Sequence, residues 1–174
     1  ILAVGLDMYL RLLDDAIEEL GEGKSETAPE VFLELDYSGY IPDTYIEEPM
    51  EKMEVYKKIA SIDTEQDLDS VHRQLIDRFG PLPDEVESLF AIAETRVLCK
   101  RLYISSLRER SGSVRVEFSK MAHLKLDKVL TLIKESGGSV GLDPRQPHCL
   151  LIDTSKIALN EKSGFISERL LRLI

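Results

Sequence analysis

The sequence predicts an α+β domain in which a small mixed sheet packs with several helices, preceded by a linker helix. Some segments repeat apolar residues every three to four positions, as amphipathic helices do, and shorter ones alternate apolar and polar residues, as strands do. These elements are grouped along the chain, which favours α+β over a doubly wound α/β sheet. With 174 residues and a hydrophobic fraction of 43%, the chain is long enough for one domain with a real core.

The first part of the chain is predicted to contain a helix, a linker and a strand. Residues 6–20 have helical spacing, and Gly21 suits the C-terminal end of that helix. A polar stretch with Gly and Pro follows, and it is typical of a linker. Apolar residues then alternate over 31–38, which predicts a strand. The predicted division is 1–21 for the first helix, 22–30 for the linker and 31–174 for the domain.

Three consecutive helices are predicted next. The first covers 50–60, and its inward residues are expected to be Met53, Tyr56, Ile59 and Ala60. Thr64-Glu65-Gln66-Asp67 resembles a capping box, with Asp in the position more often held by Glu or Gln, and should open a helix that runs to Phe79.

Gly and Pro residues separate the second of these helices from the third. Gly80 should end one helix, and Pro81 and Pro83 prevent its continuation. Asp84 suits the positive end of the next helix, which is expected to reach about Tyr103. The two helices should therefore form an αα-hairpin or corner.

The rest of the chain is more mixed. Segments 104–109 and 113–119 flank Ser111-Gly112 and predict a β-hairpin. The remaining predicted elements are a helix over 126–135, a strand over 148–153 and a helix over 160–174.

Charge is spread unevenly along the chain. The sequence has 32 acids and 22 bases, a net charge of −10. Residues 1–69 hold 19 acids and 5 bases, a balance of −14, and residues 70–174 hold 13 acids and 17 bases, a balance of +4. The overall acidity argues against a nucleic-acid clamp made by the whole chain, because phosphate binding needs a positive surface. A local basic patch remains open.

Composition also indicates the cellular environment in which the chain is expected to work. Cys99 and Cys149 are two isolated cysteines, which predict neither a disulfide framework nor a zinc site, and favour a reduced, cytoplasmic environment. No stretch approaches 18 apolar residues, so no membrane contact is expected. The first residues contain neither Met nor a basic segment, which we interpret as a piece of a longer protein.

The sequence does not predict an active site or a cofactor site. Gly23-Lys24-Ser25 lacks the earlier glycine of a phosphate-binding loop and is not preceded by a strand. His72, His123 and His148 are scattered without metal-ligand spacing, and His72 is expected to be a partly buried packing residue. We therefore expect no catalytic residues, metal or cofactor in this chain.

Two surfaces remain as candidate binding sites, each with a plain solvated face as the alternative. On the predicted helix 64–79, Asp77 falls opposite the apolar face and should be exposed. Its flanking residues on that face are Ser70, Arg73 and Gln74. The second surface is basic and could bind nucleic acid or an acidic partner; its residues are Arg96, Lys100 and Arg101 on one helix side, with Arg108, Arg110 and Arg115 in the hairpin.

Several segments resemble a known family. The run LIDRFGPLPDEVESLF (75–90) is similar to a signature in the C-terminal domain of bacterial transcription-repair coupling factors, the Mfd family. Four further segments agree and occur in the right order: VGLDMYLRLLDDAI (4–17), YIPDTYI (40–46), YKKIAS (56–61) and IAETRVLCKRL (92–102). The resemblance is strong over 4–104 and looser over the hairpin and the tail.

The resemblance implies a function for the whole protein and for this part of it. Family members are ATP-driven DNA translocases that displace stalled RNA polymerase and recruit UvrA for nucleotide excision repair. Their ATPase motifs lie in a motor domain, from which the segment resembling 4–17 exits. The C-terminal domain is regulatory and non-catalytic: it docks on the UvrB-like module of the same protein and masks the surface meant for UvrA. RNA polymerase and DNA are contacted through other domains.

The resemblance also implies roles for two residues. In the family, acidic side chains on the LIDRFG helix meet arginines of the UvrB-like module. Asp77 keeps such an acid, whereas Gln74 replaces an acid found in some members. Gln74 can still hydrogen-bond an arginine but cannot form an ion pair. The alternative function, an accessory nucleic-acid-binding domain, would use the basic helix and the hairpin arginines.

Overall fold

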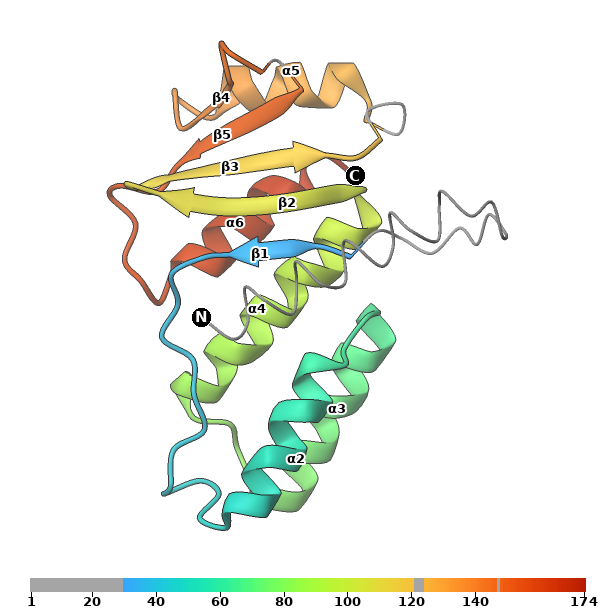
Figure 1. Cartoon of the computed structure of the whole chain (residues 1–174), viewed down its shortest axis with the longest axis vertical. Helices are drawn as coiled ribbons and strands as arrows, with labels where there is room; N and C mark the ends of the chain where they lie inside the picture. The colour runs from blue at the N-terminus through green and yellow to red at the C-terminus, as the bar shows by residue number, and fades with distance from the viewer. Residues whose placement is uncertain (1–29, 121–123, 147) are drawn as a thin grey trace, which may run out of the picture.

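The computed structural model describes residues 30–120, 124–146 and 148–174, and it confirms the α+β class (Figure 1). The predicted helix 1–21, nearly all of the linker 22–30, Gly23-Lys24-Ser25 and His123 lie outside these residues. The elements in chain order are β1 (Phe32–Glu34), α2 (Pro49–Ala60), α3 (Glu65–Phe79), α4 (Asp84–Arg101), β2 (Ile104–Arg110), β3 (Ser113–Phe118), α5 (Leu126–Glu135), β4 (Val140–Leu142), β5 (Cys149–Asp153) and α6 (Lys162–Leu171).

The sheet is mixed and has the strand order β1-β2-β3-β5-β4. β1 pairs parallel with β2, and the other neighbouring strands pair antiparallel. The predicted hairpin forms β2 and β3, and its turn places Ser111 and Gly112 at φ 51° and 75°. β4 was not predicted, because three residues are too few to show alternation. The strand predicted over 31–38 shrinks to Phe32–Glu34.

One face of the sheet is covered by α4 and α6, and its side chains form the sheet core. Val114, Val116 and Phe118 face this core, because alternate residues of β3 point to the same face of the sheet. α4 and α6 approach closely where the buried hydroxyls of Thr95 and Ser167 lie 2.9 Å apart. The central members of the sheet core are Leu107, Val114, Val116, Leu150, Ile152, Ile166 and Leu170.

A second apolar cluster, the helical core, lies between α2, α3 and the first turns of α4 (Figure 1). The capping box of α3 is present: Thr64 Oγ1 accepts from the Asp67 backbone N–H at 3.1 Å, and the Asp67 carboxylate accepts from the Thr64 N–H at 3.0 Å. Gly80 ends α3 at φ 87°, a conformation that favours glycine. The members of the helical core are Ile41, Ile46, Val55, Ile59, Ile62, Leu75, Val86, Leu89, Phe90, Ala93 and Val97.

The predicted inward face of α2 was largely wrong. Val55 and Ile59 are buried, but Met53 is 55% exposed, and Tyr56 and Ala60 are also exposed. The hydroxyl of Tyr56 accepts a hydrogen bond from the Ile41 N–H at 2.8 Å, so its ring lies at the edge of the helical core. α2 therefore packs through a narrow stripe of β-branched residues rather than through its largest side chains.

None of the helices within the described ranges has the length and apolar character that crossing a membrane requires.

Candidate functional site: a groove between α2 and α3

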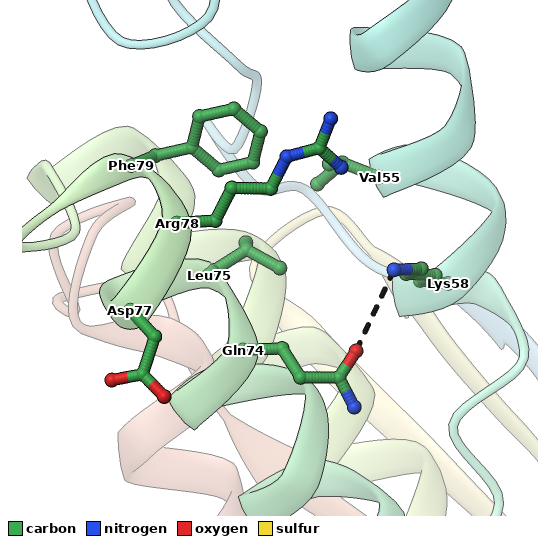
Figure 2. Close-up of a pocket in the computed structure, with 7 residues that line it drawn as sticks. All are labelled: Val55, Lys58, Gln74, Leu75, Asp77, Arg78 and Phe79. Atoms are coloured by element: carbon green, nitrogen blue, oxygen red, sulfur yellow. Dashed lines mark hydrogen bonds between the residues drawn. The ribbon is translucent and has the colours of Figure 1, made fainter.

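Two of the four predicted interface residues, Gln74 and Asp77, line a groove between α2 and α3, which we call the α2–α3 groove (Figure 2). Its volume is about 340 Å³. The groove has an apolar floor, and polar side chains from both helices form its edges. The lining residues are Val55, Lys58, Gln74, Leu75, Asp77, Arg78 and Phe79.

The burial of one face of α3 fixes which residues reach the groove and the solvent. Leu75 is 2% exposed and holds α3 against the helical core. Asp77 is exposed, as its helical phase predicted, and in Figure 2 its carboxylate points away from α2. Ser70, Arg73 and Gln74 are exposed as well. The structure therefore brings all four predicted interface residues to the solvent side of one helix.

Gln74 and Ser70 are already joined to each other and to α2. The Gln74 side-chain N–H donates to Ser70 Oγ at 3.1 Å, and Lys58 Nζ donates to Gln74 Oε1 at 3.5 Å (Figure 2). Arg73 Nε donates to the Asp69 carbonyl at 3.2 Å, one turn earlier on the same helix. These bonds orient the polar edge of the groove before any partner arrives.

Asp77 is the acid at the groove that keeps its full acceptor capacity. It makes no hydrogen bond or ion pair with the described part of the chain. Its neighbour Arg78, by contrast, donates to Glu51 on α2 at 2.6 Å and lies 4.9 Å from the Phe79 ring centre. An approaching cation would therefore find one unpaired carboxylate at this edge, and Arg78 would not compete for it.

Tyr45 anchors the C-terminal end of α3 beside the groove. Its hydroxyl donates to the Gly80 carbonyl at 3.0 Å, and its ring centre lies 5.9 Å from that of Phe79. Burial, and secondarily the nearby Glu87 carboxylate, raise the pKa of Tyr45, so the phenol stays protonated as a donor. At the other end of α3, the Thr64 hydrogen bond lowers the pKa of Asp67.

The basic residues predicted on α4 are brought together, but they face the connection between α2 and α3. Arg96 donates to the Ala60 carbonyl at 3.0 Å. Lys100 pairs with Asp63, and Arg101 pairs with Glu65 at 2.9 Å. Backbone and acid partners therefore occupy these cations and hold the start of α3 against α4.

The hairpin arginines lie elsewhere and are also occupied. Arg110 Nη2 lies 2.7 Å from Glu34 Oε1, and Arg115 lies 3.4 Å from Asp143. The Arg108 guanidinium lies 4.4 Å from the centre of the Phe32 ring. The structure thus does not merge the helix and hairpin cations into one free positive surface among the described residues.

His72 and the two cysteines fit packing roles. His72 is partly buried, as predicted, with its ring 5.1 Å from that of Phe90 and Nε2 3.5 Å from Glu87. Cys99 and Cys149 are buried free thiols, and burial raises the pKa of Cys99 to about 12. Within the described ranges, no three His, Cys, Asp or Glu side chains gather as a metal site would require.

Sequence reasoning missed the contribution of α2 to the site. Val55 and Lys58 line the groove, and Glu51 holds Arg78 beside it. Lys58 lies 16 positions from Gln74, and Glu51 lies 27 positions from Arg78. The available signal was the general tendency of consecutive elements to lie side by side. It does not specify which residues of α2 meet α3.

Comparison with known proteins places the chain in a family. A model of the TRCF domain family matches residues 35–129. A solved structure described as the C-terminal domain of transcription-repair coupling factor superposes with a TM-score of 0.68 at 24% identity, covering 84% of this chain and 95% of that one. That structural match shows a shared fold.

Curated relatives agree with the family model. The transcription-repair-coupling factor of Borreliella burgdorferi is 30% identical over 164 residues, which are 94% of this chain and 15% of the relative. That of Bacillus subtilis is 32% identical over 143 residues, covering 80% of this chain and 12% of the relative. That of Escherichia coli is 30% identical over 145 residues, covering 80% and 13%. The chain thus spans less than a sixth of these relatives, and it belongs to the transcription-repair coupling factor family, with the fold of the C-terminal domain.

Proposed function

We propose that this chain is the non-catalytic, autoinhibitory domain of a cytoplasmic transcription-repair coupling factor. In this proposal α3 docks on the UvrB-like module of the same protein and masks the surface that UvrA would bind. The parent protein would be the ATP-dependent DNA translocase, acting on DNA and stalled RNA polymerase through its other domains. The domain itself would need no cofactor.

The observation that carries the proposal is the state of Asp77. It is an exposed carboxylate without a partner among the described residues, at the edge of a groove on the LIDRFG helix. Its neighbour Arg78 is already paired with Glu51 of α2. An arginine of the UvrB-like module could therefore bind Asp77 without displacing an internal partner, and Gln74 could accept a second hydrogen bond from it.

Contacts of this strength suit an interface between two domains that forms and dissociates reversibly. A rim ion pair contributes roughly 0–1 kcal/mol, whereas a more desolvated arginine–carboxylate pair couples more strongly. A tether between the two modules would raise their effective concentration, so modest contacts can hold the closed state. UvrA would then shift the equilibrium by its greater affinity for the open state.

The alternative of an accessory nucleic-acid-binding domain gains no support from the geometry. Arg96, Lys100 and Arg101 face backbone or acid partners, and the hairpin arginines lie apart from them. Binding to duplex DNA would have to break these contacts first. A DNA titration at low and moderate salt distinguishes the two functions, because phosphate binding falls steeply with salt.

The direct test mixes the 174-residue chain with the isolated UvrB-like module and measures the dissociation constant by calorimetry. We expect Asp77→Arg to weaken binding by at least about tenfold, because it replaces attraction with repulsion. Glu168→Arg is the matched control: it makes the same charge change at an exposed acid on α6, away from α3 (Figure 1). In the full-length protein, Asp77→Arg should also raise basal ATPase activity. Equal binding and ATPase activity for both variants would refute the assigned contact.

A further inference from the structure

One face of the sheet carries none of the described helices, and we call it the open face (Figure 1). The helices that reach the sheet core, α4, α5 and α6, all pack on the side of Leu107, Val116 and Leu150. Successive residues of a strand point to opposite faces, so the neighbours of these residues along each strand point to the open face. On that face, the register places Arg108 of β2 directly opposite Arg115 of β3.

The sheet supplies an acid to only one of these two arginines. Like charges directly opposite each other in a sheet repel, so each arginine needs an anion nearby. Arg115 lies 3.4 Å from the Asp143 carboxylate. Arg108 makes no hydrogen bond or ion pair with the described part of the chain. Its register partner on β1, Glu34, is taken by Arg110, whose Nη2 lies 2.7 Å from Glu34 Oε1.

The Arg108 guanidinium is held in place although its donors are unused. It lies 4.4 Å from the centre of the Phe32 ring, and this cation–π contact uses the flat side of the guanidinium rather than its N–H groups. Its Nε is buried and has no acceptor among the described residues. Buried donors are seldom left unpaired in proteins. A planar fork that rests on a ring is therefore oriented in advance to bind a carboxylate through two N–H groups.

The other charges of the open face indicate which kind of anion fits. Its charged strand residues are three arginines and three acids, so the face has no net positive charge. Glu117 lies on β3, on the opposite side of β2 from the Phe32 ring, and makes no ion pair with Arg108. A continuous phosphate chain needs a positive surface, whereas a single carboxylate needs only the fork of Arg108. The charged strand residues of the open face are Glu34, Arg108, Arg110, Arg115, Glu117 and Asp153.

From this geometry we infer that Arg108 on the open face binds a glutamate or aspartate side chain of a partner protein. The carboxylate would accept from two N–H groups of the guanidinium, and Phe32 would keep the guanidinium flat. The bound anion would also offset the repulsion between Arg108 and Arg115. The inference does not depend on the proposed contact at Asp77, where α3 offers an acid to a cation; here the sheet offers a cation to an acid.

A titration of the 174-residue chain with a hexaglutamate peptide, followed by NMR at low salt, tests the site. We expect saturable shifts of the β1 and β2 amides and of the Arg108 Nε–H signal. Arg108→Gln should weaken binding by at least about fivefold, because it removes a bidentate charged contact. Arg101→Gln is the matched control: it makes the same charge change on α4, where Arg101 already pairs with Glu65 at 2.9 Å. An equal loss in both variants, or no saturable shift in the wild-type chain, would overturn the inference.

Two further comparisons identify the ligand and the type of contact. A six-nucleotide oligothymidylate should bind at least about tenfold more weakly than hexaglutamate, because the acids of the open face repel its phosphates. Equal or tighter binding of the oligonucleotide would overturn the assignment to an acidic protein. Arg108→Lys keeps the charge but lacks the planar fork, so it should retain only part of the affinity. Full affinity in Arg108→Lys would refute the bidentate contact. Unchanged amide shifts in the sheet core would show that each variant is folded.

Discussion

The sheet core and the helical core differ in the sequence separation of the residues that form them. The sheet core is closed by strand pairing between residues far apart in sequence, and it buries a carboxylate, Glu109, at its edge. The helical core is closed by consecutive helices, and polar contacts such as Arg78–Glu51 and Lys100–Asp63 stay at its surface. α4 belongs to both, since Phe90 and Val97 pack in the helical core and Cys99 and Leu102 in the sheet core.

This difference separates two kinds of surface. The helical core leaves polar edges, and the α2–α3 groove with its unpaired Asp77 lies there. The sheet core leaves an apolar hollow between α5 and the sheet, and Leu126, Leu130 and Leu142 are among its lining residues. A charged, releasable contact suits the first surface, and a lasting apolar contact suits the second.

Removing the buried carboxylate of the sheet core should have the largest effect. Glu109 accepts hydrogen bonds from Lys162 Nζ at 2.6 Å, Thr154 Oγ1 at 2.8 Å and the Asp36 N–H at 3.2 Å. Glu109→Ala should lower the free energy of unfolding by about 3–5 kcal/mol, because the partly buried Lys162 loses its nearest counter-charge and keeps only Asp36 at 3.8 Å. Urea unfolding measures the loss. Glu34→Ala, which removes a more exposed ion pair on β1, should cost about 1 kcal/mol or less; equal losses would contradict the contrast.

The same carboxylate should make stability depend on pH. Burial acts to raise the pKa of Glu109, but the hydrogen bonds from Lys162, Thr154 and the Asp36 backbone outweigh it and leave the pKa lowered. A lowered pKa stabilises the fold above the unfolded value of about 4.3, and this contribution is lost as the pH falls through the folded pKa. The wild-type free energy of unfolding should therefore decrease more steeply below about pH 4.3 than that of Glu109→Gln. Parallel pH profiles would contradict this assignment.

Truncating one leucine in each core tests whether the two cores unfold together. Leu107 is 0% exposed in the sheet core, and Leu75 is 2% exposed in the helical core. Each change to Ala should cost about 2–5 kcal/mol, because it removes buried methyl groups and leaves a cavity. Since α4 joins the cores, both variants should show one shifted unfolding transition by circular dichroism and by fluorescence of the tyrosines. Two separate transitions in Leu75→Ala would show that the helical core unfolds independently.

Loss of the capping box should weaken the helical core alone. Thr64→Ala removes the hydroxyl that accepts from the Asp67 N–H, and it should cost about 1 kcal/mol. Hydrogen exchange should increase in the first turn of α3 and stay unchanged in β2 and β3. The control Thr131→Ala alters an exposed threonine in α5, a helix outside the helical core. Faster exchange throughout the sheet in Thr64→Ala would contradict the expected local effect.

The smallest predicted effect concerns the polar edge of the α2–α3 groove. If the proposed docking is correct, Gln74→Glu should tighten binding to the UvrB-like module by at most about fivefold, the range of an exposed ion pair. Lys58, which bonds Gln74 Oε1 at 3.5 Å, should pair with the new carboxylate and limit the gain, so adding Lys58→Ala should enlarge it. Gln66→Glu makes the same change in the first turn of α3, away from the groove lining. An equal gain from Gln66→Glu would indicate a general charge effect.

Sequence reasoning succeeded where the signal was local and failed where it was not. The capping box of α3, the stop at Gly80 and the exposed phase of Asp77 follow from spacing within one helix, and all three are present. The inward face of α2 was wrong because Met53 and Tyr56 were judged by their hydrophobicity, whereas contact with α3 selects Val55 and Ile59. A preference for large apolar residues inside is a tendency, and packing geometry overrides it.

Periodicity, capping and turn residues predicted most of the elements, their order and the family from the sequence alone, although β4 was missed. The tertiary structure alone decided which charges remain unpaired. Arg96, Lys100 and Arg101 look in sequence like a free basic patch, yet the fold gives them Ala60, Asp63 and Glu65 as partners. Asp77 is left without a partner among the described residues. The physical reason is that ion pairs depend on distances of a few ångströms between helices, and their relative placement is fixed by the cores between them.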